Sequence, residues 1–148
     1  MKQDNYTGTL IGCAIGDTLG MPVETWPKER IKKYHGRITS PVKQKIIMDE
    51  SGKEINEDEF GKIKYWAGHL NAGDYTDDTI LTLALANSIL DKNSLDLEDI
   101  AKKQLAEYEA RVNPDGTYSG GFGGTTVQAF KRLQQGISPL ESGIIGGP

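Results

Sequence analysis

Glycine recurs at every fourth position near the start of the chain, at residues 8, 12, 16 and 20. The residues between them are mostly apolar, and their spacing predicts a helix from about residue 5 to residue 19. Each interior glycine costs about 1 kcal/mol of helix propensity relative to alanine, so another interaction must offset the loss. Glycines four apart share one helix face, which allows close approach by another helix or by a ligand. For Gly8 and Gly12 we favour helix packing, and Gly20, followed by Pro22, fits a C-terminal cap.

The segment Tyr75–Thr79 opens the most apolar run of the chain. Leucine, isoleucine and alanine follow it at helical spacing, which predicts a helix over 79–90 with this segment at its N-terminus. Thr76, Asp77 and Asp78 then set three hard oxygen ligands side by side, which suits Mg²⁺ better than Zn²⁺. The same residues also suit a helix start without metal, because threonine and aspartate cap helices and carboxylates complement the helix dipole. Taken alone, the segment favours capping, and its context has to decide.

The rest of the chain also has the pattern of a helical protein. Further helices are predicted over 28–34, 94–111 and 127–133, the second with a capping box at Asp96 and Asp99. Residues 44–64 differ, because acidic side chains surround Ser51 and Gly52, which predicts a small hairpin or a mobile insertion with a short strand at 44–48. With helices on both sides of every loop, the fold class is predicted to be all-α and compact.

Composition limits the function classes. The chain has 148 residues and a net charge of −4, so it offers one domain at most and lacks the basic stripe expected of a nucleic-acid-binding protein. Lys28, Arg30, Lys32 and Lys33 form the only basic cluster, which we interpret as a solvated helix face. The hydrophobic content of 36% is low for a self-sufficient globule and mildly favours a missing half, or a partner, that completes the core.

The chain carries neither a secretion signal nor a run long enough to cross a bilayer. Its single cysteine, Cys13, cannot form an internal disulfide and is expected to pack as a small apolar residue. These features predict a soluble protein of the reducing cytoplasm, with no membrane or nucleic-acid partner.

Two segments, Gly12–Glu24 and Gly73–Thr79, together resemble the ADP-ribosylglycohydrolase family, of the dinitrogenase-reductase-activating type. That family has a Gly-x-Ala-x-Gly-Asp-x-x-Gly-x-x-x-Glu helix exit and, further along the chain, a Thr-Asp-Asp-Thr helix start. A third segment, Gly120–Thr126, looks like the family's glycine-aromatic-glycine loop, which runs along the diphosphate and adenosine of ADP-ribose. The resemblance implies a compact orthogonal helical domain of the same type.

The resemblance also implies a role for each matching residue. Thr76, Asp77 and Asp78 would bind one or both Mg²⁺ ions of a binuclear centre, in which Mn²⁺ can substitute. Glu24 would be the acid/base carboxylate beside the anomeric carbon, and Asp17 is expected to be structural. The predicted contacts with diphosphate and adenosine come from Gly121, Phe122, Gly123 and Gly124.

The chain departs from the family in length. By resemblance, members run to roughly twice this length and carry a second metal-binding motif, Asp-x-Asp-Thr, near their C-terminus. No such motif is present in this sequence. Residues 1–148 are therefore interpreted as the N-terminal part of one ADP-ribosylglycohydrolase-like domain, either a fragment or a naturally shortened relative.

Two functional hypotheses follow from the resemblance. In the first, the chain carries half the site of a Mg²⁺-dependent enzyme that hydrolyses the bond between ADP-ribose and a modified side chain. This enzyme would be inactive until the rest of the domain or a second polypeptide completes it. In the second, the chain is a non-catalytic protein that binds ADP-ribose or a similar nucleotide. A structural relative that has lost the ligand is a third, simpler alternative.

Overall fold

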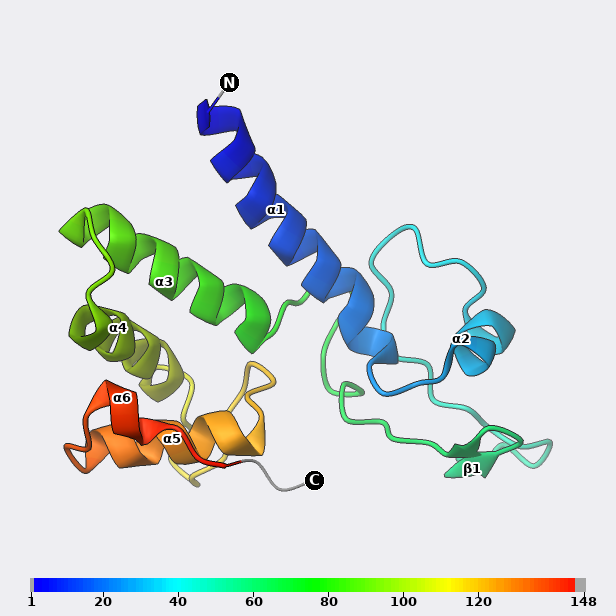
Figure 1. Ribbon diagram of the computed structural model, residues 1–148. Coiled ribbons are helices and arrows are strands. Elements are labelled where there is room, and N and C mark those ends of the chain that lie inside the picture. The colour runs from blue at the N-terminus through cyan, green and yellow to red at the C-terminus, as the bar shows by residue number, and fades with distance from the viewer. Residues whose placement is uncertain (1, 146–148) are drawn as a thin grey trace. The chain divides into compact units, whose positions relative to one another are not determined.

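The computed structural model describes residues 2–145. Within them lie six α-helices, one short 3-10 helix and one two-stranded antiparallel hairpin (Figure 1). The mainly helical prediction is confirmed, and the hairpin falls inside the insertion predicted at 44–64. In chain order the elements are α1 (Lys2–Gly20), η1 (Met21–Val23), α2 (Lys28–Tyr34), β1 (Glu57–Asp58), β2 (Gly61–Lys62), α3 (Asp77–Lys92), α4 (Leu97–Glu109), α5 (Gly124–Gln134) and α6 (Pro139–Ser142). Among the helices described, none combines the length and the apolar character that a membrane span requires.

The chain divides into two compact units. Unit 1 combines the start of α1, up to Cys13, with the chain from Thr76 onward, and so contains α3, α4, α5 and α6. Unit 2 is Ala14–Tyr75 and contains the end of α1, η1, α2 and the hairpin.

Helix ends follow the local sequence. Asp96, the N-cap of α4, accepts the backbone N–H of Asp99 at 3.1 Å, as a capping box predicts. Helix α2 ends at Tyr34 and the chain turns away at Gly36, where φ is +70° and the N–H donates to the carbonyl of Ile31 at 3.1 Å. Glycine adopts this left-handed conformation without strain. Asn93 ends α3 in the same conformation, with φ of +51°.

The core of unit 1 is largely aromatic. Its buried residues are Ile80, Tyr108, Phe122, Val127 and Phe130, contributed by α3, α4, the loop before α5, and α5. The Tyr108 ring stacks on Phe130 with ring centroids 5.1 Å apart and meets Phe122 edge-on at 5.4 Å. Such geometries add about 0.5–1.5 kcal/mol per pair beyond area burial, so these rings fix the loop before α5 against α3 and α4.

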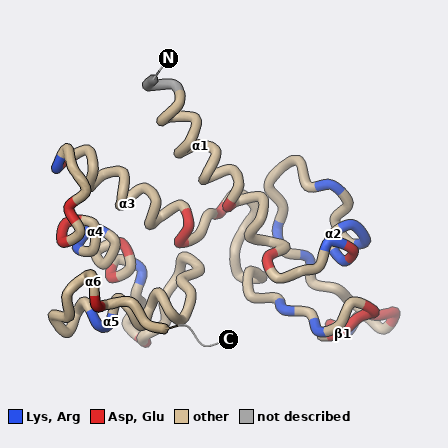
Figure 2. The backbone as a smooth tube through the Cα atoms, viewed as in Figure 1, with Lys and Arg blue, Asp and Glu red and all other residues tan. Residues whose placement is uncertain are grey.

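Arg30 on α2 holds the hairpin of unit 2. Its guanidinium donates to both carboxylate oxygens of Asp58 at 2.7–3.3 Å and to the carbonyls of Gly61 and Lys62 at 2.7 and 3.2 Å. The hydrogen bond from Arg30 is the main reason why the pKa of Asp58 lies below its ordinary value. Interpreting Arg30 as part of a solvated face was therefore wrong, because a carboxylate and two carbonyls satisfy it inside unit 2. The lysines of α2 are exposed as predicted, and Lys33 lies 2.7 Å from Glu59 directly after β1, in the acidic region coloured red in Figure 2.

Three other local predictions need correction. Gly20 has φ of −83° and ψ of −38°, so it is no left-handed cap and α1 runs directly into η1. The predicted strand at 44–48 is absent from the described residues except for an isolated bridge between Met48 and Glu54. Gln44 is buried and donates to the carbonyl of Pro22 at 3.2 Å, so this segment lies against the core of unit 2 instead of pairing. The third correction concerns the helix packing expected at Gly8 and Gly12. No atom lies within 4 Å of a β-carbon at either position among the residues described.

Candidate functional site

The start of α3 presents the predicted oxygen ligands. Thr76 is the N-cap residue, and Asp77 and Asp78 form the first turn. The Thr76 side chain is buried and makes no capping hydrogen bond, although its carbonyl accepts the N–H of Ile80 at 3.1 Å. Asp78 is exposed and Asp77 is half-buried. The helix dipole stabilises both carboxylates here.

The glycine-rich loop ends at the N-terminus of α5. Gly120 and Gly121 have φ of +96° and +77°, a conformation that favours glycine. Gly123 is the N-cap of α5, Gly124 is its first residue, and both are exposed. The first helical hydrogen bond of α5 runs from the N–H of Val127 to the carbonyl of Gly123 at 3.0 Å. The N–H groups before Val127 have no acceptor within the helix, so this helix end can receive an anion.

Phe122 lies between these glycines but points into the core. It is buried, and its ring lies 5.4 Å from that of Tyr108 and 6.0 Å from that of Phe130. This packing anchors the loop and thereby fixes the path of its backbone. A direct contact between Phe122 and a ligand stays a prediction.

The α3 start and the glycine loop meet inside unit 1. A β-carbon at Gly120 would lie 3.0 Å from Cε2 of Phe122 and 3.1 Å from Cδ1 of Ile80. Ile80 belongs to the first turns of α3, two residues after Asp78. The loop therefore packs tightly against α3 at position 120, where a larger residue would press on both side chains and would also have to adopt the φ of +96° that favours glycine. Ile80 and Gly120, forty residues apart in sequence, are thus brought together.

Glu24, the predicted acid/base, belongs to unit 2 with Asp17. It caps the C-terminus of η1, where its N–H donates to the carbonyl of Met21 at 3.4 Å, and its side chain is exposed. The next buried residue along the chain, Trp26, donates its indole N–H to the carbonyl of Lys64 at 3.1 Å. The Glu24 carboxylate is therefore exposed, while the chain two residues later is held in place by Trp26. Asp17 is half-buried in the last turn of α1.

Thr25 carries a feature that the sequence did not predict. Its φ is +67°, in the left-handed region, although it is not glycine. For a β-branched residue this conformation is an outlier and costs about 1–3 kcal/mol, and such strain is often found at functional sites. Sequence gives no signal for it, because threonine is a residue that local rules would keep out of a left-handed turn. The strain lies directly beside Glu24.

The donors at the start of α3 suit Mg²⁺ chemically, since a hydroxyl and two carboxylates are hard oxygen ligands. Among residues 2–145, no group of three or more His, Cys, Asp or Glu side chains is placed to hold a metal ion. Mg²⁺ takes about six oxygen ligands in octahedral geometry. Thr76, Asp77 and Asp78 would therefore supply only part of its coordination, and the rest would come from water, a bound ligand or further carboxylates.

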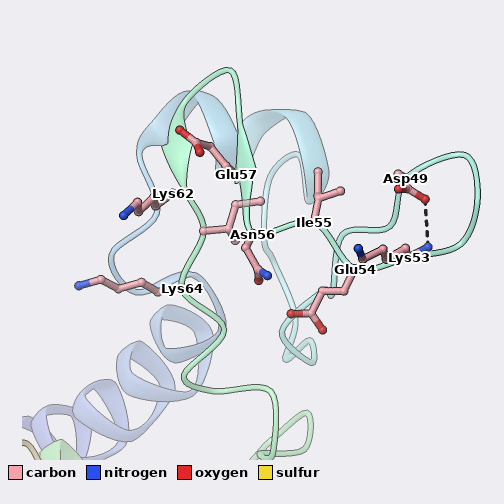
Figure 3. A pocket seen from close by; sticks show the side chains of 9 residues that line it. Asp49, Lys53, Glu54, Ile55, Asn56, Glu57, Lys62 and Lys64 are labelled. Atoms are coloured by element: carbon pink, nitrogen blue, oxygen red, sulfur yellow. Dashed lines mark hydrogen bonds between the residues drawn. The ribbon is translucent and has the colours of Figure 1, made fainter.

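Two hollows among the described residues are lined by residues outside the predicted site. In unit 2 the insertion surrounds an open hollow of about 680 Å³, lined by both acidic and basic side chains (Figure 3). There Asp49 accepts the N–H of Lys53 at 3.0 Å and orders the turn. In unit 1 a hollow of about 340 Å³ is lined mainly by apolar side chains of α3, α4, α5 and α6.

The protein is mostly helical. A glycine-rich loop packs against the first turns of α3, the helix that begins with the sequence Thr-Asp-Asp-Thr. The family model for ADP-ribosylglycohydrolase matches residues 1–146, and the chain belongs to that family.

Two relatives match almost the whole chain. The uncharacterized protein YegU of Escherichia coli is 28% identical, with 99% of this chain and 40% of YegU covered. An uncharacterized protein of Archaeoglobus fulgidus is also 28% identical, with 96% of this chain and 38% of the relative covered. The chain thus spans about two fifths of the length of the curated relatives it matches.

Proposed function

We propose that this chain carries the first half of the active site of a Mg²⁺-dependent hydrolase of the dinitrogenase-reductase-activating type. The enzyme would cleave the glycosidic bond between ADP-ribose and a modified protein side chain or related acceptor. Its partner is then ADP-ribose or an ADP-ribosylated protein. Residues 1–148 form the N-terminal part of one such domain, and we expect them to be inactive without the remainder.

Each residue has a chemical role in this proposal. Glu24 exchanges a proton with the attacking water or with the leaving group, while the water oxygen bonds to the anomeric carbon and the side chain of the acceptor departs. Thr76, Asp77 and Asp78 would hold Mg²⁺, which would orient the ribose hydroxyls. Asp17 ties the end of α1, and the backbone of Gly121, Gly123 and Gly124 receives the diphosphate.

The observation that carries the proposal is the packing of the glycine loop against α3. At Gly120 the loop before α5 lies against Ile80 in the first turns of α3, the helix that begins at Thr76, Asp77 and Asp78, and this contact supports a shared site. A nucleotide diphosphate and a divalent cation need this pairing of N–H donors with hard oxygen ligands. Family membership supports the same substrate class.

A second candidate is a non-catalytic ADP-ribose-binding protein. It is favoured by the small number of carboxylates at the α3 start, since residues 2–145 contain no larger metal-holding group. Half a coordination sphere can support nucleotide binding without organising the reaction. Turnover by the chain combined with the missing part of the domain would separate the two candidates.

The binding step can be tested with proline at the first position of α5. Proline fits the first turn of a helix, and Gly123 before it is extended, so Gly124→Pro removes one N–H donor without breaking the helix. A hydrogen bond to a charged group is worth about 1.5–3 kcal/mol, so ADP-ribose affinity should fall at least about tenfold. Leu97→Pro makes the same change at the first position of α4 and should leave affinity unchanged. Unchanged ADP-ribose binding by Gly124→Pro, measured by calorimetry with Mg²⁺, would remove the loop from the site.

A further inference from the structure

Glu24 lies on an exposed turn between two buried residues of unit 2. Pro22 and Trp26, two residues before and two residues after it, are buried, whereas Glu24 and Thr25 are exposed. A carboxylate that transfers a proton must be held in place, because a displacement of about 1 Å can cost about a hundredfold in rate. The contacts that hold this turn therefore bear on the role proposed for Glu24.

Gln44 holds the start of this turn. The residue is only 3% exposed, and its side-chain amide donates from Nε2 to the carbonyl of Pro22 at 3.2 Å. The carbonyl of Met21, one residue earlier, accepts the backbone N–H of Glu24 at 3.4 Å. Carbonyls at the C-terminal end of a helix have no partner within it, so Gln44 supplies a donor that η1 itself cannot provide.

Trp26 and Gln44 share a second acceptor, the carbonyl of Lys64. The indole N–H of Trp26 donates to it at 3.1 Å, and the Gln44 amide donates to it at 3.5 Å. Gln44 and Lys64 are the first and last residues of the insertion predicted at 44–64. The two ends of that insertion thus meet at the turn that bears Glu24.

The chain at Lys64 is in turn fixed to the hairpin. The N–H of Ile63 donates to the carbonyl of Asn56 at 2.8 Å, and the Ile63 side chain is buried. One residue earlier, the carbonyl of Lys62 accepts the guanidinium of Arg30 at 3.2 Å. The shared acceptor therefore belongs to a segment that is itself well anchored.

We propose that Gln44 is a positioning residue that, together with the indole of Trp26, fixes the turn bearing Glu24. Thr25 lies between these two anchors with φ of +67°, and such a conformation persists only where the surrounding structure enforces it. Without the Gln44 amide the turn can relax and displace the Glu24 carboxylate. This role of Gln44 rests on the acid/base function proposed for Glu24 above.

The variant Gln44→Met, made in a completed domain, tests whether the turn is held. The carbonyl of Pro22 loses its donor, but methionine also removes the Gln44 Oε1 atom, which is buried without a hydrogen-bond partner among residues 2–145. These two effects partly cancel, so the urea midpoint should change little. Amide hydrogen exchange of residues 24–26 should become about three- to tenfold faster, the range that one hydrogen bond corresponds to, while exchange in α2 stays the same. Gln104→Met is the matched control, because the Gln104 amide also donates to a carbonyl, that of Leu81 at 3.3 Å, but in unit 1.

Turnover of ADP-ribosylated peptides gives a second readout, which a general loosening of the fold would not reproduce. Gln44→Met should lower kcat about tenfold or more and leave KM and ADP-ribose affinity unchanged, because it displaces a proton-transfer group and removes no ligand contact. Combined with Glu24→Gln, it should lower kcat by less than about a further twofold, because the carboxylate that it positions is already gone.

Exchange of residues 24–26 that is unchanged in Gln44→Met, or that rises equally throughout α2, would overturn the positioning role. So would a turnover that Glu24→Gln lowers and Gln44→Met does not, or two losses that add in full. If Gln44→Met does not fold, Gln44→Asn, whose amide is one methylene shorter, should show the same changes. Unchanged turnover in Glu24→Gln would instead refute the acid/base function, and the exchange rates would still decide whether Gln44 holds the turn.

Discussion

Replacing Arg30 with methionine tests whether its buried ion pair holds unit 2 together. Methionine keeps the length and apolar stem of arginine but removes the charge and all its donors. The side chains of Arg30 and Asp58 are only 2% and 3% exposed. The variant therefore leaves the Asp58 carboxylate buried, with the N–H of Phe60 at 2.8 Å as its remaining short contact, and leaves the carbonyls of Gly61 and Lys62 without this donor.

The structure allows the loss to be worked out. Removing one partner of a buried ion pair typically costs about 3–5 kcal/mol. The carboxylate can escape part of that cost by taking up a proton, at about 1.4 kcal/mol per pH unit above an ordinary pKa of about 3.9. At pH 7 this route costs about 4 kcal/mol, and at pH 5 only about 1.5 kcal/mol. We therefore expect Arg30→Met to lose about 4 kcal/mol of unfolding free energy at pH 7 and about half as much at pH 5.

The assay is urea unfolding followed by tryptophan fluorescence, because both tryptophans, Trp26 and Trp66, lie in unit 2. The double variant Arg30→Met, Asp58→Asn should be about 2 kcal/mol more stable than Arg30→Met alone at pH 7, because the amide at position 58 removes the unpaired charge. Lys33→Met is the matched control, because Lys33 also joins α2 to the hairpin region, by a 2.7 Å contact with Glu59, but is exposed and should hardly shift the midpoint. An unchanged midpoint for Arg30→Met at pH 7, or a loss that does not shrink at pH 5, would refute the reasoning.

Four further predictions concern unit 2 and the proposed site. Burial, and secondly the charge of Lys45, lower the pKa of His35, so unit 2 should lose stability as pH falls below about 6.5. His35→Gln should make the stability depend less on pH. The probe is the fluorescence of Trp26, whose ring lies 5.7 Å from that of His35. An equally steep loss of stability with falling pH in His35→Gln would show that His35 is not its cause. Thr25→Gly should raise the urea midpoint, because glycine relieves the strain at φ of +67°. Thr25→Ala should not raise it. A loss of stability in Thr25→Gly would exclude backbone strain at this position. In a completed domain, Glu24→Gln should lower turnover of ADP-ribosylated peptides by about 10²–10⁴-fold with little change in ADP-ribose affinity, and unchanged turnover would remove Glu24 from catalysis. Asp78→Asn should weaken the line broadening that Mn²⁺ causes near the start of α3, and equal broadening in both proteins would remove Asp78 as a metal ligand.

Most of the helical fold could be predicted because its signals are local. Apolar spacing places α3 within about two residues of its observed ends, and Asp96 caps α4 through a bond between neighbours in sequence. The errors arise where distant residues decide. Arg30 belongs to a run that is otherwise lysine, and only its contact with Asp58, twenty-eight residues away, makes it a buried residue. The backbone of Gly20 is right-handed because the chain continues directly into η1.

The site shows the same division between local and distant information. Sequence alone identifies the α3 start and the glycine loop as motifs, but not the contact at Ile80 that brings them together. It also assigns Phe122 to a ligand contact, which stays a prediction, but it does not show that this side chain packs in the aromatic core. An aromatic residue between glycines has the same local pattern in both cases. The left-handed φ of Thr25 also has no local signal in the sequence, because a β-branched residue rarely adopts it.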